Sequence, residues 1–307
     1  MANWATKKPA VNLPALSKVS LSKISLLKAP KAVGLSALAL GLVALGVGAW
    51  RHTHPPLPAE YQTLQAVVGR LAAHNALGTS PIGLSINNGS YAATLAEMRG
   101  YCKEAACDFY AQLNPYKSYG KDWDEIGRQS YTLGDVGAWS TSSGTIEVPR
   151  TAFRVYGRHT GWLACTVAHE IAHIQRNHVF QASYYVNNTI RSALEKKQDE
   201  LTYSKSRQQE LEADRDSAVM MARAGYKGRI CIDDLVFLHK SSGDGSATEP
   251  DSTHPGYDER IKELAAFYAK LEKDPPAKVS PTPGHFTYSP ADNLLSFVPS
   301  KPLPTHP

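Results

Sequence analysis

The chain has 307 residues, enough for one large domain or two small ones, and its 42% hydrophobic and 20% charged residues are typical of a globular protein. The formal net charge is +5, but the first 51 residues carry seven basic and no acidic side chains, so residues 52–307 carry a net charge of −2. The basic isoelectric point therefore comes from the N-terminal tail. It gives no reason to expect nucleic-acid binding.

A hydrophobic segment at residues 32–50 follows the basic tail and contains no charged residue. A helix of ~19 residues spans roughly the 30 Å hydrocarbon core of a bilayer. Lysines precede this segment, so the positive-inside rule leaves the tail, residues 1–31, in the cytoplasm. We expect a transmembrane signal anchor in a bacterial inner membrane, with the domain that follows it on the periplasmic side.

Two other interpretations fit the same segment. Val47 and Ala49 form a small-residue pattern typical of signal-peptide cleavage, which would release a secreted protein. The acid-free tail, rich in Ser and Lys, also resembles a mitochondrial transit peptide, which would direct the protein to the mitochondrial inner membrane. The sequence leaves all three open.

After the turn sequence "HPPLP", helical and strand periodicities alternate over a predicted main domain at residues 58–274. From residue 275 onward, nine of 33 residues are proline, which predicts an extended or disordered C-terminal extension, 275–307. The predicted elements, in chain order, are a helix at 59–76, a strand at 81–87, a tyrosine-rich stretch of unassigned role at 91–131, a hairpin at 138–149, and helices from Thr160, at 181–224, at 230–240 and at 257–273.

The four cysteines do not define the compartment. An even number fits an oxidising environment, and four buried free thiols fit equally well. Their pairing is left open by the sequence; they are Cys102, Cys107, Cys165 and Cys231.

The segment "AHEIAHIQRNH" carries the clearest chemical signal. His169 and His173 are four residues apart, so on a helix both imidazoles can reach one metal ion, and Glu170 can reach a water molecule beside it. An apolar stripe covers the opposite side of this helix, so the histidines are not needed for the core. The competing interpretation is an ordinary amphipathic helix with surface histidines. The stripe consists of Leu163, Val167, Ile171 and Ile174.

Catalytic zinc normally takes three protein ligands. "SRQQELEADRDSA" offers Glu210 with Asp214, or Glu212 with Asp216, at the same helical spacing, and a solvated charged face is the alternative. In the first register Glu210 would bind the metal and Asp214 would accept a hydrogen bond from a zinc-binding histidine. His178 misses the metzincin spacing by one residue, and we interpret it as a polar residue at the helix end.

Three motifs in order, "AHEIAHIQRNH", "SRQQELEADRDSAVMMARAGY" and "STHPGYDERIKEL", together resemble the HtpX-like zinc metallopeptidases, or minor gluzincins. The resemblance covers roughly residues 59–272. It implies an α+β, mainly helical zincin-type domain with a small sheet whose edge lies beside the cleft. It also implies Glu210 as the third ligand, and a substrate edge strand including Ala138, Gly144 and Ile146.

This chain departs from the family in several respects. Gly137 replaces the Asn that usually precedes the alanine of that strand, which puts the details of substrate contact in doubt. A single membrane segment is predicted where HtpX itself has several, and no tetratricopeptide-like repeats follow the catalytic part.

The motif "THPGYDERI" adds two candidates. The family places this motif near the cleft, so His254 could stabilise the oxyanion or occupy the open zinc position in a resting state. Arg260 could support His254. The alternative is that the histidine and Pro255 only shape a loop before the last helix.

These residues predict a zinc endopeptidase with one Zn²⁺ per chain, held by His169, His173 and Glu210. Glu170 would serve as general base, and the substrates would be unfolded or damaged proteins, as in protein quality control. The main alternative is a membrane-anchored binding or assembly factor whose zinc site is structural or closed by His254. A third is an anchor without metal.

Overall fold

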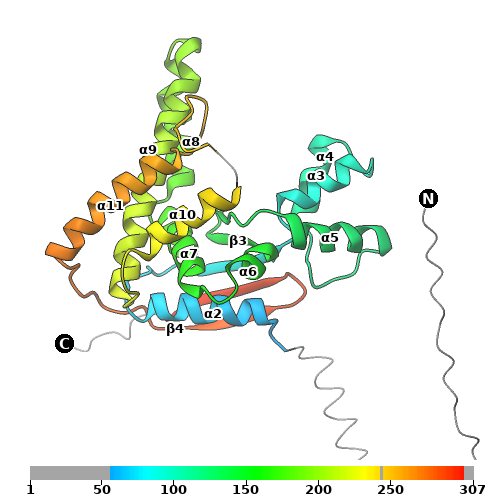
Figure 1. The fold of residues 1–307 in the computed structure, drawn as a ribbon, viewed down its shortest axis with the longest axis horizontal. Coiled ribbons are helices and arrows are strands. Elements are labelled where there is room, and N and C mark those ends of the chain that lie inside the picture. The colour runs from blue at the N-terminus through cyan, green and yellow to red at the C-terminus, as the bar shows by residue number, and fades with distance from the viewer. Residues whose placement is uncertain (1–55, 243–244, 301–307) are drawn as a thin grey trace, which may run out of the picture. The chain divides into compact units, whose positions relative to one another are not determined.

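The computed structural model describes residues 56–242 and 245–300, and residues 57–300 belong to one compact unit (Figure 1). The predicted membrane segment, residues 32–50, lies outside the described residues. Among the residues described, no helix combines the length and apolar character that a membrane crossing requires.

A sheet of five strands, in the order β2-β3-β1-β5-β4, forms the base of the described fold. β1 and β3 are parallel, and the other neighbouring strands are antiparallel. The central β1 is almost continuously buried, although its apolar residues alternate with glycine, serine and asparagine. The strands are β1 (Ile82–Asn87), β2 (Trp139–Ser140), β3 (Thr145–Pro149), β4 (Gly284–Ser289) and β5 (Leu294–Pro299).

The proline-rich C-terminal segment differs from the prediction of a separate extension. β4 and β5 form a hairpin, β5 pairs with β1, and Leu295 and Phe297 are buried in the main core. The prolines fall before, between and at the ends of these strands, where a missing N–H costs no ladder hydrogen bond. The expected boundary after residue 274 is therefore wrong, because the hairpin completes the sheet.

Helices make up most of the described part, so the expected α+β, mainly helical class describes it (Figure 1). The helical region predicted at roughly 181–224 consists of two helices joined by a 3-10 turn. The helices are α2 (Ala59–Ala72), α3 (Ser90–Met98), α4 (Glu104–Ala111), α5 (Lys121–Leu133), α6 (Arg150–Tyr156), α7 (Thr160–Gln175), α8 (His178–Asn188), α9 (Glu195–Arg223), α10 (Ile230–Ser242) and α11 (Tyr257–Lys273).

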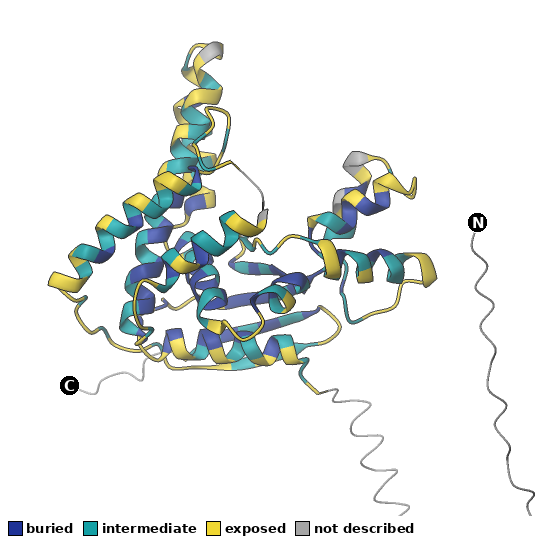
Figure 2. Ribbon diagram, viewed as in Figure 1, coloured by how far each residue is buried: buried dark blue, intermediate teal, exposed yellow. Residues whose placement is uncertain are grey.

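Helix α7 is the central helix of the fold, in contact with β2 and β3 and with α2, α9 and α10. Its predicted apolar stripe is buried as expected: Leu163, Val167 and Ile171 are inside the core, and Ile174 is half-buried (Figure 2). Burying these side chains fixes the rotation of α7. His169 and His173 consequently face away from the sheet-side core.

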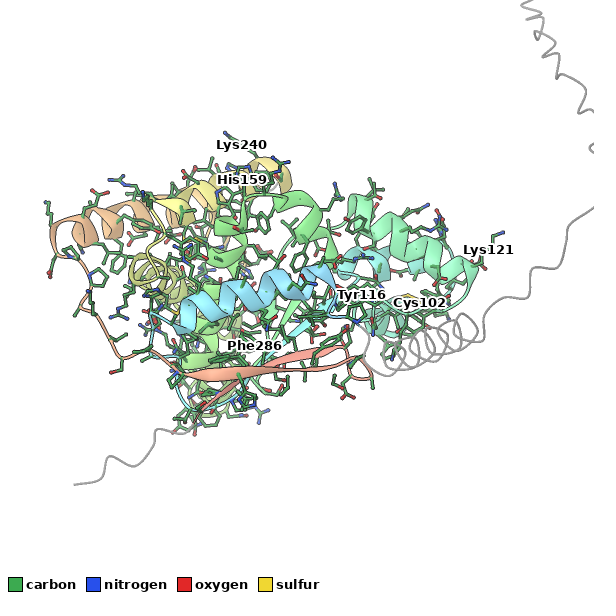
Figure 3. All side chains as sticks on the ribbon, turned by 90° about the horizontal axis from the view of Figure 1, so that it is seen from below. Cys102, Tyr116, Lys121, His159, Lys240 and Phe286 are labelled. Carbon is green, nitrogen blue, oxygen red and sulfur yellow. A yellow bond between two sulfur atoms is a disulfide. The ribbon has the colours of Figure 1, made fainter. Side chains whose placement is uncertain are left out.

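Two disulfides answer the question of cysteine pairing. Cys165 on α7 is bonded to Cys231 on α10, which ties these helices together. Cys102 is bonded to Cys107 in the tyrosine-rich stretch. That stretch forms α3, α4 and α5, which enclose a small hydrophobic core of their own. Figure 3 labels Cys102 in this lobe, and shows Phe286 of β4 beneath α2.

Candidate metal centre

Helices α7 and α9 bring together three side chains that could hold a metal ion. His169 and His173 come from α7 and Glu210 from α9, and their ligand atoms all lie within 4.8 Å of one another. The separations are 3.0 Å between the two Nε2 atoms, 3.2 Å from His169 Nε2 to Glu210 Oε2, and 3.4 Å from His173 Nε2 to Glu210 Oε1.

These separations fit zinc. Ligand atoms about 2.0–2.1 Å from a tetrahedral Zn²⁺ are separated from one another by roughly 3.3 Å. The three observed distances lie on either side of that value, and two imidazoles with one carboxylate are a common donor set for catalytic zinc. Glu212 is turned away from this group and toward Arg176 and His178, so the structure brings Glu210, and not Glu212, to the histidines.

The non-ligating nitrogen of His169 faces a buried ion pair. Asp214 Oδ1 lies 3.0 Å from His169 Nδ1, where it would accept the imidazole N–H and fix the tautomer. Arg260 donates two hydrogen bonds to the same carboxylate, from Nε at 2.8 Å and Nη2 at 2.6 Å. Arg260 therefore acts on His169 through Asp214. The expectation that it supports His254 finds no such contact among the described residues.

His173 has an equivalent partner that the sequence analysis missed. His178 Nδ1 lies 2.9 Å from His173 Nδ1, and His178 Nε2 lies 3.3 Å from Glu212 Oε2. With His173 Nε2 directed at a metal, its Nδ1–H donates to His178, whose own N–H then donates to Glu212. His178 lies at a helix end, as expected, but it is only 2% exposed and contacts a candidate ligand, a role that the sequence analysis did not give it.

The contact between His173 and His178 depends on Asn177, which adopts the left-handed backbone conformation. α7 ends at Gln175, and Asn177 adopts φ 53° and ψ 41°, a conformation that asparagine tolerates better than most residues. The chain reverses there, so α8 begins at His178 and its side chain points back to His173. Residues five apart do not share a face of a continuous helix, so helical spacing alone could not reveal the pair.

The charges of the group follow from its burial and its neighbours. Burial would lower the pKa of His169, but the hydrogen bonds that its ring donates to the Asp214 and Glu210 carboxylates outweigh burial and raise this pKa to about 10. Burial and the adjacent His169 cation lower the pKa of His173 to about 3. In the metal-free protein His169 is thus protonated and bridges two carboxylates, and metal binding must displace that proton.

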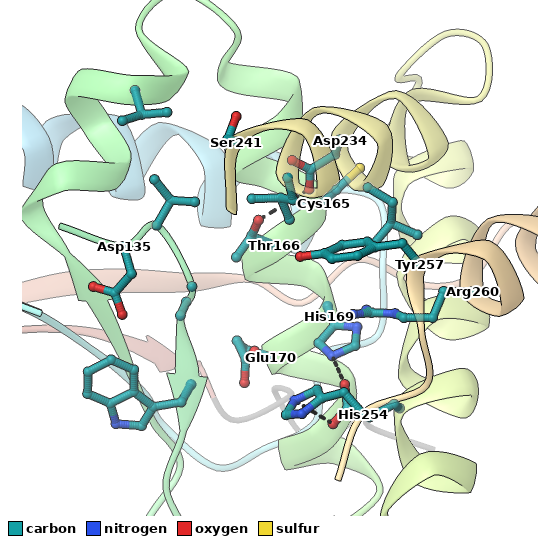
Figure 4. A pocket seen from close by; sticks show the side chains of 18 of the residues that line it. Asp135, Cys165, Thr166, His169, Glu170, Asp234, Ser241, His254, Tyr257 and Arg260 are labelled. Carbon is teal, nitrogen blue, oxygen red and sulfur yellow. Dashed lines mark hydrogen bonds and ion pairs between the residues drawn. The ribbon is translucent and has the colours of Figure 1, made fainter. Parts of the chain in front are cut away.

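Glu170 lies on the wall of the same cleft as the three candidate ligands (Figure 4). It is 7% exposed, and burial raises the pKa of its carboxyl to about 7, although the Ser140 hydroxyl beside it acts in the opposite direction. A carboxyl with a pKa near neutrality can both take and return a proton under physiological conditions.

Only part of the predicted substrate edge strand lies at an edge of the sheet. β2 is the terminal strand of the sheet, and Ala138, Trp139 and Ser140 line the cleft. Gly144 forms the turn into β3 at φ +82°, a conformation that favours glycine. Ile146 is fully buried in β3, between β2 and β1, so it cannot present an edge to a substrate.

His254 lies beside the candidate ligands on the loop before α11. Its Nε2 is 3.7 Å from Glu210 Oε1, and its side chain is 61% exposed and lines the cleft. Its Nδ1 is held by the Thr253 hydroxyl at 2.9 Å. His254 therefore presents its Nε2 to the ligand group from the exposed side of the cleft.

A mainly helical fold in which two helices contribute a His₂Glu group at zinc-compatible distances is typical of metallopeptidases. Comparison with known families agrees. Residues 137–267 match the model described as peptidase family M48, a family of zinc-dependent metallopeptidases. The match spans β2 to α11 and includes all three candidate ligands. It confirms the resemblance to HtpX-like enzymes that the three motifs predict.

No curated protein and no solved structure matches the chain.

Proposed function

We propose that this protein is a membrane-anchored zinc endopeptidase that hydrolyses peptide bonds in unfolded or damaged proteins. The observation that carries the proposal is the placement of Glu170 in the same cleft as His169, His173 and Glu210, whose ligand atoms have the separations of a zinc tetrahedron. When bound, zinc supplies Lewis acidity, which acidifies water and polarises a carbonyl group.

The protein's own residues would perform the proton transfers and the positioning. Glu170 takes a proton from the attacking water and later delivers it to the leaving amine. Asp214 with Arg260, and His178 with Glu212, hold the two histidine rings in the orientation and tautomer that ligation requires.

The edge of the sheet would align the substrate. β2 pairs with β3 on one side only, so the main-chain groups of its other side have no strand partner, and its residues line the cleft. An extended substrate adding as a further strand would be bound through main-chain hydrogen bonds. Such binding requires an unfolded segment and selects little for its sequence, which suits a quality-control role.

We further propose that residues 32–50 anchor the chain in a membrane, with the catalytic domain outside the cytoplasm. Two disulfides among the described residues fit an oxidising compartment. Extraction of membranes with alkaline carbonate tests the anchor. A full chain that remains with the lipid supports it, and complete release of the full chain into the soluble fraction contradicts it.

The experiment for the activity compares the full zinc-loaded chain with its Glu170→Gln variant on a reduced, alkylated and therefore unfolded protein. Mass spectrometry detects fragments, and atomic absorption measures bound zinc. We expect fragments from the parent only, with one zinc in each protein. Equal cleavage by both proteins contradicts Glu170 as the base.

A second candidate function is favoured by the contact between His254 and Glu210. His254 could close the metal site, which would make the protein a binding or assembly factor with a gated or structural zinc. If neither protein cleaves although both hold zinc, this second function is supported. Cleavage that appears in His254→Ala then distinguishes a gated enzyme from a structural site.

A further inference from the structure

Asp234 on α10 is a buried carboxyl group in the wall of the cleft that the proposed mechanism does not use. It is 4% exposed, and it lines the cavity of about 1030 Å³ that also contains His169 and Glu170. Its Oδ2 accepts a hydrogen bond from Thr166 at 3.3 Å, but its Oδ1 is buried without any hydrogen-bond partner among the described residues. An unpartnered buried carboxylate oxygen is costly, so a partner is expected from outside the chain.

The cations that line the cleft are already engaged. Arg260 is committed to Asp214 through two hydrogen bonds. Arg154 donates to the main-chain carbonyl oxygens of Tyr131 and Thr132. In the described part of the chain, Asp234 therefore has no basic side chain as a direct partner.

The position of Asp234 places it close to the reaction. Thr166 precedes Glu170 by one turn of α7, about 6 Å along the helix. An extended substrate advances about 3.3 Å per residue, so a side chain that reaches Asp234 belongs to a residue within about two positions of the cleaved bond. Figure 4 shows Asp234 and Thr166 on the α7 side of the pocket that contains Glu170.

The surroundings suit a long side chain with a charged end. Leu235, Leu238 and Tyr257 line the same cavity, next to the Cys165–Cys231 disulfide that fixes α10 against α7. Apolar and aromatic walls accommodate an alkyl stem, and an aromatic ring also attracts a cation. Burial raises the pKa of Asp234 to about 7, so an approaching cation can ionise it near neutral pH.

We propose that Asp234 is the base of a side-chain subsite that binds the ammonium or guanidinium group of a substrate lysine or arginine next to the cleaved bond. This proposal rests on the proposed peptidase function and adds side-chain selectivity to binding through main-chain groups. The charge-assisted hydrogen bonds of such a pair are the strong ones in proteins, and guanidinium can satisfy both carboxylate oxygens at once.

A purely structural role for Asp234 is the competing explanation, because its carboxyl and the Tyr156 and Thr166 hydroxyls lie together. Asparagine keeps the size and the acceptor oxygen of Asp234 and removes only the charge. Citrulline likewise has the shape of arginine without its charge. Combining the two substitutions separates recognition of a cation from support of the fold.

The test measures binding, so it does not depend on turnover. The full zinc-loaded chain carrying Glu170→Gln is titrated calorimetrically with alanine-based hexapeptides that contain one arginine, lysine or citrulline at each position in turn. Their N-termini are acetylated, so that only the side chain supplies a cation. A parallel set with free N-termini shows whether the subsite takes an α-ammonium group instead.

We expect arginine at one position to bind about tenfold or more tightly than citrulline at that position. Adding Asp234→Asn should abolish this preference, whereas Asp233→Asn, which changes an exposed carboxyl on the same helix, should retain it. Equal binding of arginine and citrulline peptides at every position, no binding by any peptide, a preference that survives Asp234→Asn, or a preference only for free N-termini overturns the proposal.

The outcomes separate this proposal from the proposed function. If peptide binding prefers a positive charge and depends on Asp234, but the parent protein does not cleave, the subsite proposal is supported and the peptidase proposal is contradicted. If cleavage depends on Glu170 but peptide binding shows no preference for a positive charge, the peptidase proposal is supported and the subsite proposal is contradicted.

Discussion

His178 Nδ1 lies 2.9 Å from His173 Nδ1, although the two residues are on different helices. The contact gives His173 an outer partner, as Asp214 gives one to His169. Each candidate histidine ligand thus has a hydrogen-bond partner at its non-ligating nitrogen. For His169 the partner is the Asp214 carboxylate, and for His173 it is the His178 imidazole, which itself contacts Glu212. Such partners orient the ligand and fix the nitrogen that faces the metal.

Replacing His178 with alanine should therefore lower zinc affinity about 10- to 100-fold. Competition with a chelator of known affinity measures the change. His285→Ala removes an exposed histidine from β4 and serves as the control, with unchanged affinity expected. An affinity that is unaffected by His178→Ala would show that the contact does not position the ligand.

The register of the third ligand gives a second prediction. Glu210→Gln should remove most of the zinc affinity, because both of its carboxylate oxygens face the histidine Nε2 atoms. Glu212→Gln should have a smaller effect, since Glu212 acts only through His178. Zinc content after dialysis against a weak chelator distinguishes them. If Glu212→Gln lowered zinc affinity more than Glu210→Gln, the assignment of Glu210 as the third ligand would be wrong.

The buried pair of Asp214 and Arg260 predicts a pH-dependent loss of stability. Arg260→Gln removes the guanidinium charge and its two hydrogen bonds from the buried Asp214 carboxylate and leaves only His169 as a cationic neighbour, and we expect the free energy of unfolding of the zinc-free protein at pH 7 to fall by about 3–5 kcal/mol. Although burial opposes it, Arg260 holds the pKa of Asp214 well below its usual range. Stabilisation by such a group is present above its unfolded pKa and is lost as pH falls.

Denaturant unfolding at a series of pH values checks this prediction. The difference between parent and Arg260→Gln should be largest above about pH 4 and should narrow in more acidic solution, as Asp214 becomes protonated in both proteins. The double variant Asp214→Asn/Arg260→Gln should regain part of the loss at pH 7. An equal difference at all pH values would exclude the buried charge as its cause.

For Asp234 we expect the free energy of unfolding to depend on pH with the opposite sign to that expected for Asp214. Burial raises the pKa of Asp234 to about 7, so the folded protein retains a proton that the unfolded chain has already released. Stability from this group therefore decreases as pH rises from about 4 to about 7. Asp234→Asn should have little effect at pH 4 and should stabilise the protein at pH 8 by up to a few kcal/mol. Asp233→Asn is the matched control, and a destabilised Asp234→Asn variant at pH 8 would contradict the argument.

The two disulfides should contribute unequally. Cys165–Cys231 closes a separation of 66 residues and Cys102–Cys107 one of five. Replacing the first pair with alanine should lower the free energy of unfolding by about 2–4 kcal/mol, and replacing the second pair should cost less. Urea unfolding of the two double variants makes the comparison. Equal losses would indicate that chain entropy is not the source of the stabilisation.

Several elements were predictable because their signals are local. The helix with His169 and His173, its apolar stripe and the helix at 257–273 follow from periodicity alone, since one helical face is defined by spacing. The hairpin of β4 and β5 was not predicted, because prolines around its strands and at the end of β5 hid a short alternating pattern. Its partner β1 lies some two hundred residues earlier in the chain.

The sequence by itself determined the helical pair of histidines, the glutamate between them and, through ordered motifs, the family. These depend on residue type and short spacing. Helical spacing left Glu210 and Glu212 open and the family resemblance implied Glu210, which the tertiary structure places beside the histidines. Only the tertiary structure decided that His178 contacts His173 and that Arg260 pairs with Asp214. The physical reason is that the rotation of α9 and the reversal at Asn177 are set by packing between distant segments. Asp234 reaches the cleft for the same reason, because α10 is packed and disulfide-bonded against α7.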